Sequence, residues 1–146
     1  GGQWAPALAL LAQVSSSFVK ADAAVFNAAM SSCNSNGHWA HALEVMDRMP
    51  GAGIPPDVVT QSSLITACER AGLWMQALVT LREMPSLRLQ PNVVSYSAAL
   101  VGCEVSGLWR HAMHVLEDAR RHAQQPDAIM YNIVIGVCGN CGEWEQ

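Results

Sequence analysis

The chain has 146 residues, of which 51% are hydrophobic and only 14% are charged, and its formal net charge is −4. This acidic balance argues against a protein that binds nucleic acid through a broad positive surface. Ser, Asn, Gln or a charged residue interrupts every apolar stretch after a few positions, so we expect no membrane-spanning segment.

Five residue types recur along the chain with one spacing of 35 residues. The members of these series are Gly2, Gly37, Gly72, Gly107 and Gly142; Trp4, Trp39, Trp74, Trp109 and Trp144; Cys33, Cys68, Cys103 and Cys138; Ala7, Ala42, Ala77 and Ala112; and Pro56, Pro91 and Pro126. A period of this length without strand patterns predicts a helical solenoid. We therefore predict an all-α fold, an α-solenoid of tandem 35-residue antiparallel helix hairpins that forms a right-handed superhelix.

In chain order, residues 1–22 are expected to be the C-terminal part of a truncated repeat. Complete repeats follow at 23–57, 58–92 and 93–127, and residues 128–146 are expected to be the N-terminal part of another. On this interpretation the sequence is a segment of a longer array, with any targeting peptide or further domain outside it. Each repeat would bury its apolar face against its neighbours.

The repeat at 58–92 illustrates the expected hairpin. An apolar stripe through Ile65 and Cys68 predicts a first helix from about Thr60 to Arg70. Gly72 then suits a left-handed helix end. The second helix has a longer apolar stripe, formed by Trp74, Ala77, Leu78, Leu81 and Met84. Pro85 and Pro91 are expected to end it, and Asn92 can cap the next first helix.

Several motifs resemble those of the pentatricopeptide repeat family. Residues 91–100 (Pro-Asn-Val-Val-Ser-Tyr-Ser-Ala-Ala-Leu) open a first helix, residues 67–73 (Ala-Cys-Glu-Arg-Ala-Gly-Leu) close one, and residues 126–132 repeat the opening. The resemblance extends over the whole chain. It departs from the family pattern in the Trp that starts every second helix, and at Gln61, where the family usually has Tyr or Phe.

The resemblance implies sequence-specific binding of single-stranded RNA, with one base read by side chains of each repeat. In the family, one reading residue follows the first-helix aromatic position and the other is the last residue of the repeat. The implied reader pairs are Asn27 with Asp57, Ser62 with Asn92, and Ser97 with Asp127, and Asn132 is a further reader. The aliphatic residues that wedge against the bases would be Ala24, Val59, Val94 and Ile129. The family's base preferences then imply 5′-UAG-3′ followed by a pyrimidine at Asn132.

Residue type alone leaves a second interpretation open for these positions. Asp57, Asn92 and Asp127 each directly precede an expected helix, where Asp and Asn are preferred as caps. Ser and Asn are also ordinary residues on a solvated helix face. Arg70 is the implied contact to the RNA backbone, and because the other repeats lack a cation there, we expect weak binding by these repeats alone.

The sequence gives no support for a metal site, a cofactor or an enzyme. Cys138 and Cys141 have zinc-like spacing, but Cys138 continues the apolar series and no second ligand pair follows. Equivalent cysteines on stacked helices would be about 9–10 Å apart between helix axes, too far for a disulfide. We expect buried thiols that behave as small hydrophobes. His111 and His114 are expected on the outer face, and no residues complete a catalytic triad.

Two functions therefore remain. The first is RNA binding by a monomeric array that supports RNA processing, stability, editing or translation in a plastid or mitochondrion, as the family resemblance implies. The second is a helical-repeat scaffold whose concave face binds a peptide or a partner protein, which the acidic balance and the few cations favour. In either case protein partners could also bind the outer face. In the first case a catalytic domain, such as a nuclease or deaminase, could follow in the full-length protein.

Overall fold

The computed structural model describes residues 6, 9, 23–35, 38–51, 53–122 and 125–140. Within these ranges the regular secondary structure is entirely helical, and turns or loops connect the helices. The helices are α2 (Ala23–Ser35), α3 (Trp39–Gly51), α4 (Val58–Arg70), α5 (Trp74–Glu83), the 3₁₀ helix η1 (Met84–Leu87), α6 (Val93–Val105), α7 (Trp109–Arg121) and α8 (Ala128–Asn140). The predicted all-α helical repeat fold is confirmed. Among these helices none is both long and apolar enough to cross a bilayer.

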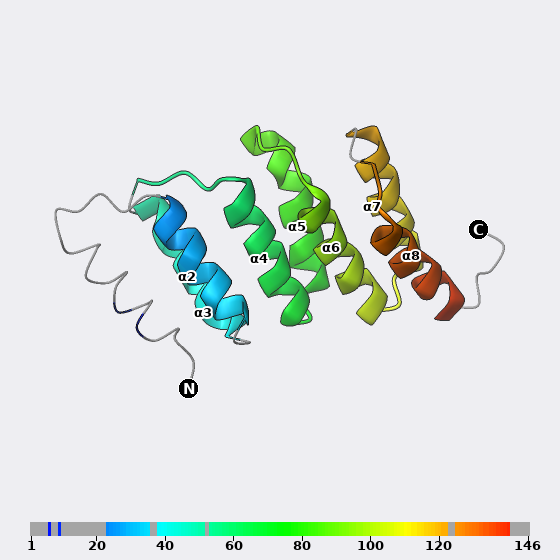
Figure 1. Cartoon of the computed structure of the whole chain (residues 1–146), viewed down its shortest axis with the longest axis horizontal. Helices are drawn as coiled ribbons and strands as arrows, with labels where there is room; N and C mark the ends of the chain where they lie inside the picture. Colours follow the sequence, from blue (N-terminus) through cyan, green and yellow to red (C-terminus); the bar gives the residue numbers. More distant parts are fainter. Residues whose placement is uncertain are drawn as a thin grey trace.

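The helices follow one another along the long axis of the molecule in chain order (Figure 1). Helix α2 packs on α3, α4 on α5, and α6 on α7, which gives three successive hairpins. The first helices of the hairpins also pack on one another, α2 on α4, α4 on α6, and α6 on α8. The array therefore has two layers, which we call the first-helix face (α2, α4, α6 and α8) and the second-helix face (α3, α5 and α7).

Two capping boxes set the start of the first helices. The side chain of Asp57 accepts a hydrogen bond from the backbone of Thr60, whose side chain accepts one from the backbone of Asp57, and Asn92 and Ser95 repeat the arrangement. Helix α4, the first helix of the repeat at 58–92, therefore begins at Val58. The sequence predicted a start at about Thr60, but Thr60 is the third residue of the helix and completes the capping box. At the other end, Gly72 has a left-handed φ of 71°, as predicted.

Among the described residues the buried apolar side chains form three clusters, and the one with the most residues extends from α4 to α8. Ile65, Cys68, Tyr96, Leu100 and Cys103 are fully or almost fully buried within it. The second-helix alanines that recur every 35 residues have no exposed surface, which allows the paired helices to approach closely; the described ones are Ala42, Ala77 and Ala112.

The expectation of buried thiols is confirmed at three of the cysteines and met only in part at Cys138. Cys33, Cys68 and Cys103 are free and buried, and Cys138 is free and half-buried. Burial raises the pKa of the Cys103 thiol to about 11. Burial also raises the pKa of Cys33 and Cys68, so these three buried thiols are protonated at neutral pH and behave as small hydrophobes. Cys141 lies outside the described residues, as do most of residues 1–22 and all of 141–146.

Candidate nucleic-acid interface

An open groove of about 330 Å³ runs over the first-helix face from α2 across α4 to the start of α6. Its walls are mainly hydroxyl and amide side chains. They include Ser31, Asn34, Ser35, Ser62, Ser63, Thr66 and Asn92, together with Val59, Val94 and Arg70. The groove thus contains one complete predicted reader pair, the two wedge residues that flank it, and the predicted backbone contact.

The predicted wedge residues are exposed in successive first helices. Val59 is 55% exposed, Val94 57% and Ile129 62%, and Ala24 is exposed as well. Branched aliphatic side chains usually lie in the core, and here they occupy the same place on the surface of three neighbouring helices. The same position therefore presents an exposed aliphatic side chain on each of α4, α6 and α8.

The first reader pair forms a closed hydrogen-bond network. The Asn27 amide nitrogen donates to the two carboxylate oxygens of Asp57 at 3.2 and 3.1 Å. The Thr60 hydroxyl lies 2.7 Å from the Asn27 side-chain oxygen, and the Thr60 backbone N–H donates to Asp57 at 2.8 Å. Burial raises the pKa of Asp57, but the hydrogen bonds from Thr60 and Asn27 outweigh it and hold this pKa below its ordinary value.

The second reader pair is linked more loosely. The Ser62 hydroxyl lies 3.4 Å from the Asn92 side-chain oxygen, 2.7 Å from the Val58 carbonyl and 2.7 Å from the Ser95 hydroxyl. Ser62 is only 5% exposed, so the expectation of a solvated helix face is wrong at this position. The reason is that α6 packs directly on α4 and places Ser95 against Ser62.

The third pair is not joined. Asp127 accepts a hydrogen bond from the Met130 backbone N–H at 2.9 Å, and among the described residues no hydrogen bond links it to Ser97. Ser97 is half-buried, and Asn132 is exposed on α8. The structure therefore brings two of the three predicted pairs into hydrogen-bond distance and leaves the third open.

Arg70 lies at the far end of the groove, where α4 meets α2. Its guanidinium donates to the backbone carbonyl of Asn34, in the last turn of α2. The Asn34 side chain donates to the Ser63 carbonyl at 2.8 Å, which joins the same two helices. Arg70 is exposed and has further N–H groups that could contact a phosphate.

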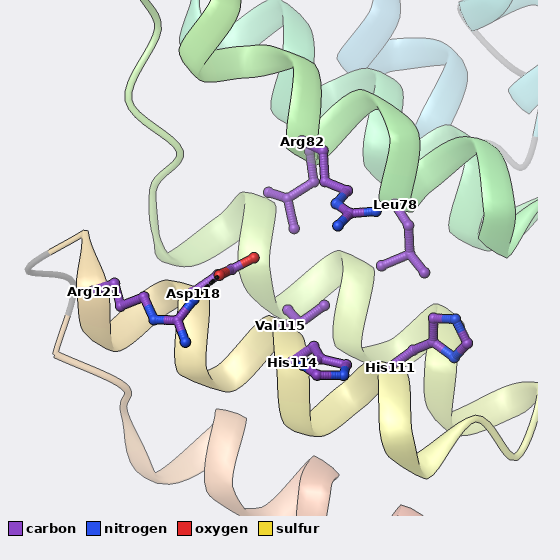
Figure 2. A pocket seen from close by; sticks show the side chains of 8 residues that line it. Leu78, Arg82, His111, His114, Val115, Asp118 and Arg121 are labelled. Carbon is purple, nitrogen blue, oxygen red and sulfur yellow. Dashed lines mark ion pairs between the residues drawn. The ribbon is translucent and has the colours of Figure 1, made fainter.

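A separate pocket of about 300 Å³ lies on the second-helix face, between α5 and α7. Figure 2 shows Arg82 reaching toward this pocket from α5, with His111, His114 and Asp118 lining it from α7. Both histidines are exposed, and Arg121 pairs with Glu117 and Asp118 at 3.5 Å. In the part of the chain that the structure describes, no three His, Cys, Asp or Glu side chains lie together as metal ligands would.

Three profiles of related repeat families match segments of this chain. A profile described as the PPR repeat family matches residues 21–70, one for the PPR repeat matches 59–89, and one for the pentatricopeptide repeat domain matches 79–141. The chain belongs to the pentatricopeptide repeat family. No curated protein matches this pentatricopeptide repeat chain significantly.

Solved structures with the same architecture are also similar. The pentatricopeptide repeat domain of Arabidopsis thaliana protein-only RNase P 1, crystallised with tRNA, has a TM-score of 0.86 at 18% identity, over 98% of this chain and 77% of that one. The pentatricopeptide repeat protein PPR10, in complex with an 18-nucleotide psaJ RNA element, has a TM-score of 0.76 at 26% identity, over 92% of this chain. A crystal structure of PPR10 from maize has a TM-score of 0.71 at 26% identity, over 98% of this chain and 20% of that one. This chain spans about a fifth of PPR10, since 20% of that protein is covered.

Three residues that shape the groove of this pentatricopeptide repeat chain were not predicted from the sequence. Thr60 and Ser95 bind the reading side chains, and Asn34 joins α2 to α4. The sequence does contain a pattern that could have predicted Thr60 and Ser95. Each stands three positions after an expected helix cap, Asp57 or Asn92, which is the spacing of a capping box. Asn34 has no such signal, since its partner is a backbone carbonyl of another repeat.

Proposed function

We propose that this chain binds single-stranded RNA in the groove of the first-helix face, with one base at each repeat. The observation that carries the proposal is the repeated pairing of an exposed aliphatic residue with a polar reader pair beside it. PPR10, a protein of the same family at 26% identity, is known in complex with an 18-nucleotide RNA element. That complex supports the same class of ligand for this chain.

The chemistry of the groove suits an unstacked base. Val59 and Val94 are exposed on consecutive first helices and line the same groove as Ser62 and Asn92. A base placed between the two valines packs its apolar faces on them and replaces the stacking that it has lost. Its edge then meets the hydroxyl of Ser62 and the amide of Asn92, which supply donors and acceptors.

The proposed target is 5′-UAG-3′, followed by a pyrimidine at Asn132. Asn27 with Asp57 would read uracil, Ser62 with Asn92 adenine, and Ser97 with Asp127 guanine. The small Ser leaves room for a purine, whereas the longer Asn amide can reach a pyrimidine edge. The wider role is in RNA processing, stability, editing or translation in a plastid or mitochondrion, without catalysis by these repeats.

The low positive charge of the groove limits the affinity. Arg70 is the cation of this groove, and part of its guanidinium is engaged with Asn34. Glu69 is the neighbour of Arg70 on α4. Burial raises the pKa of Glu69, and the positive charge of Arg70 opposes this shift. Because phosphate contacts supply much of nucleic-acid affinity, we propose that three repeats bind weakly and that affinity grows with repeat number.

A binding assay tests this function. Single-stranded RNA with the sequence UAG should bind more tightly than the same RNA in a duplex, whose base edges are paired, and binding should weaken as salt rises. Heparin serves as a polyanion control. Equal affinity for single strand, duplex and heparin would show that the groove does not read bases.

The second candidate is a protein partner, which the pocket between α5 and α7 favours. Leu81 and Val115 form its apolar floor, and Arg82 and His114 lie at its rim. Among the described residues Arg82 makes no ion pair, so its charge is available to a carboxylate. Arg82→Glu should then abolish a protein interaction and leave RNA affinity nearly unchanged, whereas loss of RNA affinity would place RNA on this face.

A further inference from the structure

A buried hydroxyl contacts a reading side chain across each of the first two repeat junctions. Thr60 and Ser95 occupy equivalent positions, 35 residues apart in the sequence, and both are fully buried. Thr60 lies 2.7 Å from the side chain of Asn27, and Ser95 lies 2.7 Å from the side chain of Ser62. In each case the hydroxyl belongs to the first helix of the repeat that follows.

At the first junction, this contact fixes the orientation of the Asn27 amide. The amide nitrogen faces the Asp57 carboxylate, and the amide oxygen faces the Thr60 hydroxyl. A reversed amide would set its oxygen against the carboxylate, and the Thr60 hydroxyl would lose its 2.7 Å acceptor on Asn27 and keep only the Asp57 carboxylate oxygen at 2.9 Å. Asn27 therefore keeps one N–H and one lone pair, in known directions, for a base.

At the second junction, the contact uses the proton of Ser62. The Ser95 hydroxyl lies 3.0 Å from the Asn92 side-chain oxygen and 2.7 Å from the Ser62 hydroxyl. Both of the 2.7 Å contacts at Ser62 are satisfied when Ser95 donates to the Ser62 hydroxyl oxygen and Ser62 donates to the Val58 carbonyl. Each hydroxyl has a single proton to donate. Ser62 then meets the base as a hydrogen-bond acceptor only, which selects for a base edge that carries a donor.

The third junction lacks the hydroxyl. Met130 occupies the position of Thr60 and Ser95, and its side chain is buried in the apolar core. It offers its backbone N–H to Asp127, but it has no hydroxyl to offer Ser97. The three junctions of one chain therefore provide two cases with the contact and one case without it.

We propose that Thr60 and Ser95 are positioning residues that set base preference, by holding the reading side chain of the preceding repeat in one hydrogen-bonding state. The inference rests on the proposed RNA binding and deepens it: the base read at each junction depends on a third residue besides the reader pair. A base opposite Ser97 is discriminated less, because nothing equivalent holds that side chain.

The test uses the full chain and three sets of single-stranded RNA, NAG, UNG and UAN in a fixed flanking sequence, where N is each of the four bases. Fluorescence anisotropy gives the dissociation constant for every RNA. Thr60→Val removes the hydroxyl and keeps the branched shape, and Ser95→Ala does the same at the next junction. Thr80→Val, a buried threonine on α5, is the matched control.

Thr60→Val should reduce discrimination at the first base by roughly three- to tenfold, the scale of one neutral hydrogen bond, and leave the other two bases unchanged. Ser95→Ala should do so at the second base alone. Thr60→Ser, which keeps the hydroxyl, should restore the preference of the first base, and Thr80→Val should change none. Circular dichroism checks folding, and if Thr60→Val unfolds, Ser95→Ala makes the same test.

Two results would overturn the inference, and they differ from a failure of the proposed function. If the variants lower the affinity of all RNAs equally and keep every base preference, the hydroxyls only stabilise the fold. If discrimination changes at a base of another junction, the assigned contact is wrong. A wild-type chain without any base preference would instead contradict the proposed function itself.

Discussion

The Asn27 amide and the Asp57 carboxylate, 30 residues apart in the sequence, are joined by hydrogen bonds of 3.1 and 3.2 Å. Asp57 also caps α4 through the Thr60 backbone N–H. The two interpretations that the sequence left open for Asp57, helix cap and reading residue, are therefore compatible. A cap fixes the carboxylate at the junction of two repeats, and this is the place where a base edge would be read.

The Asp57 network should make stability depend on acid pH. Its hydrogen bonds lower the pKa of Asp57 below the ordinary value of 3.8, so the stabilisation is complete above that value and is lost as the pH falls through the lower, folded-state pKa. Asp57→Asn lacks this titration. Thermal melts should show wild type more stable at pH 6, with the difference shrinking below about pH 4. A constant difference across the range would contradict the network.

The exposed valines should matter for binding and not for folding. Val94→Ser removes apolar surface that is already 57% exposed, so the free energy of unfolding should change by about 0.5 kcal/mol or less. RNA affinity should fall several-fold, because the substitution removes the apolar contact between this side chain and the face of a base. Val79→Ser, at an exposed valine of α5, is the control and should leave RNA affinity unchanged.

The buried thiols should be slow to react. Burial raises the pKa of Cys103 to about 11, so at pH 8 almost none of it is thiolate, the reactive form. Mass spectrometry after iodoacetamide treatment should find Cys103 unmodified in the folded protein and modified in denaturant. The half-buried Cys138 should react sooner than Cys103. Rapid labelling of Cys103 would mean that the packing of α6 opens readily.

The sequence was sufficient to predict the helical repeat because its period depends on residues that pack locally, such as Cys68, Ala77 and Gly72. The sequence predicts the start of α4 at Thr60, two residues too late, because Val58 belongs to no clear apolar stripe. Only the capping box of Asp57 and Thr60 defines the start of the helix at Val58. Contacts between repeats were less predictable. The burial of Ser62 and the hydrogen bond from Arg70 to the Asn34 carbonyl depend on how closely α2, α4 and α6 approach one another. The residue pattern within one repeat does not predict this distance.

The central claim, that each reader pair selects one base, is tested most directly at Ser97. Ser97→Asn converts the third pair to Asn with Asp127, the combination proposed to read uracil at Asn27 and Asp57. Ser97 is half-buried, and among the described residues it is not hydrogen-bonded to Asp127, so the substitution should not unfold the chain.

We predict that affinities for UAG and UAU RNA will reverse in Ser97→Asn. The change should lie at the lower end of the range of about 1–3 kcal/mol for one base contact, because Met130 has no hydroxyl to hold the new amide. Selection from an RNA pool randomised at the third base should then enrich uracil in place of guanine, with the first two bases unchanged. If the variant folds with wild-type stability and its preference at the third base stays the same, Ser97 does not read RNA and the account is contradicted.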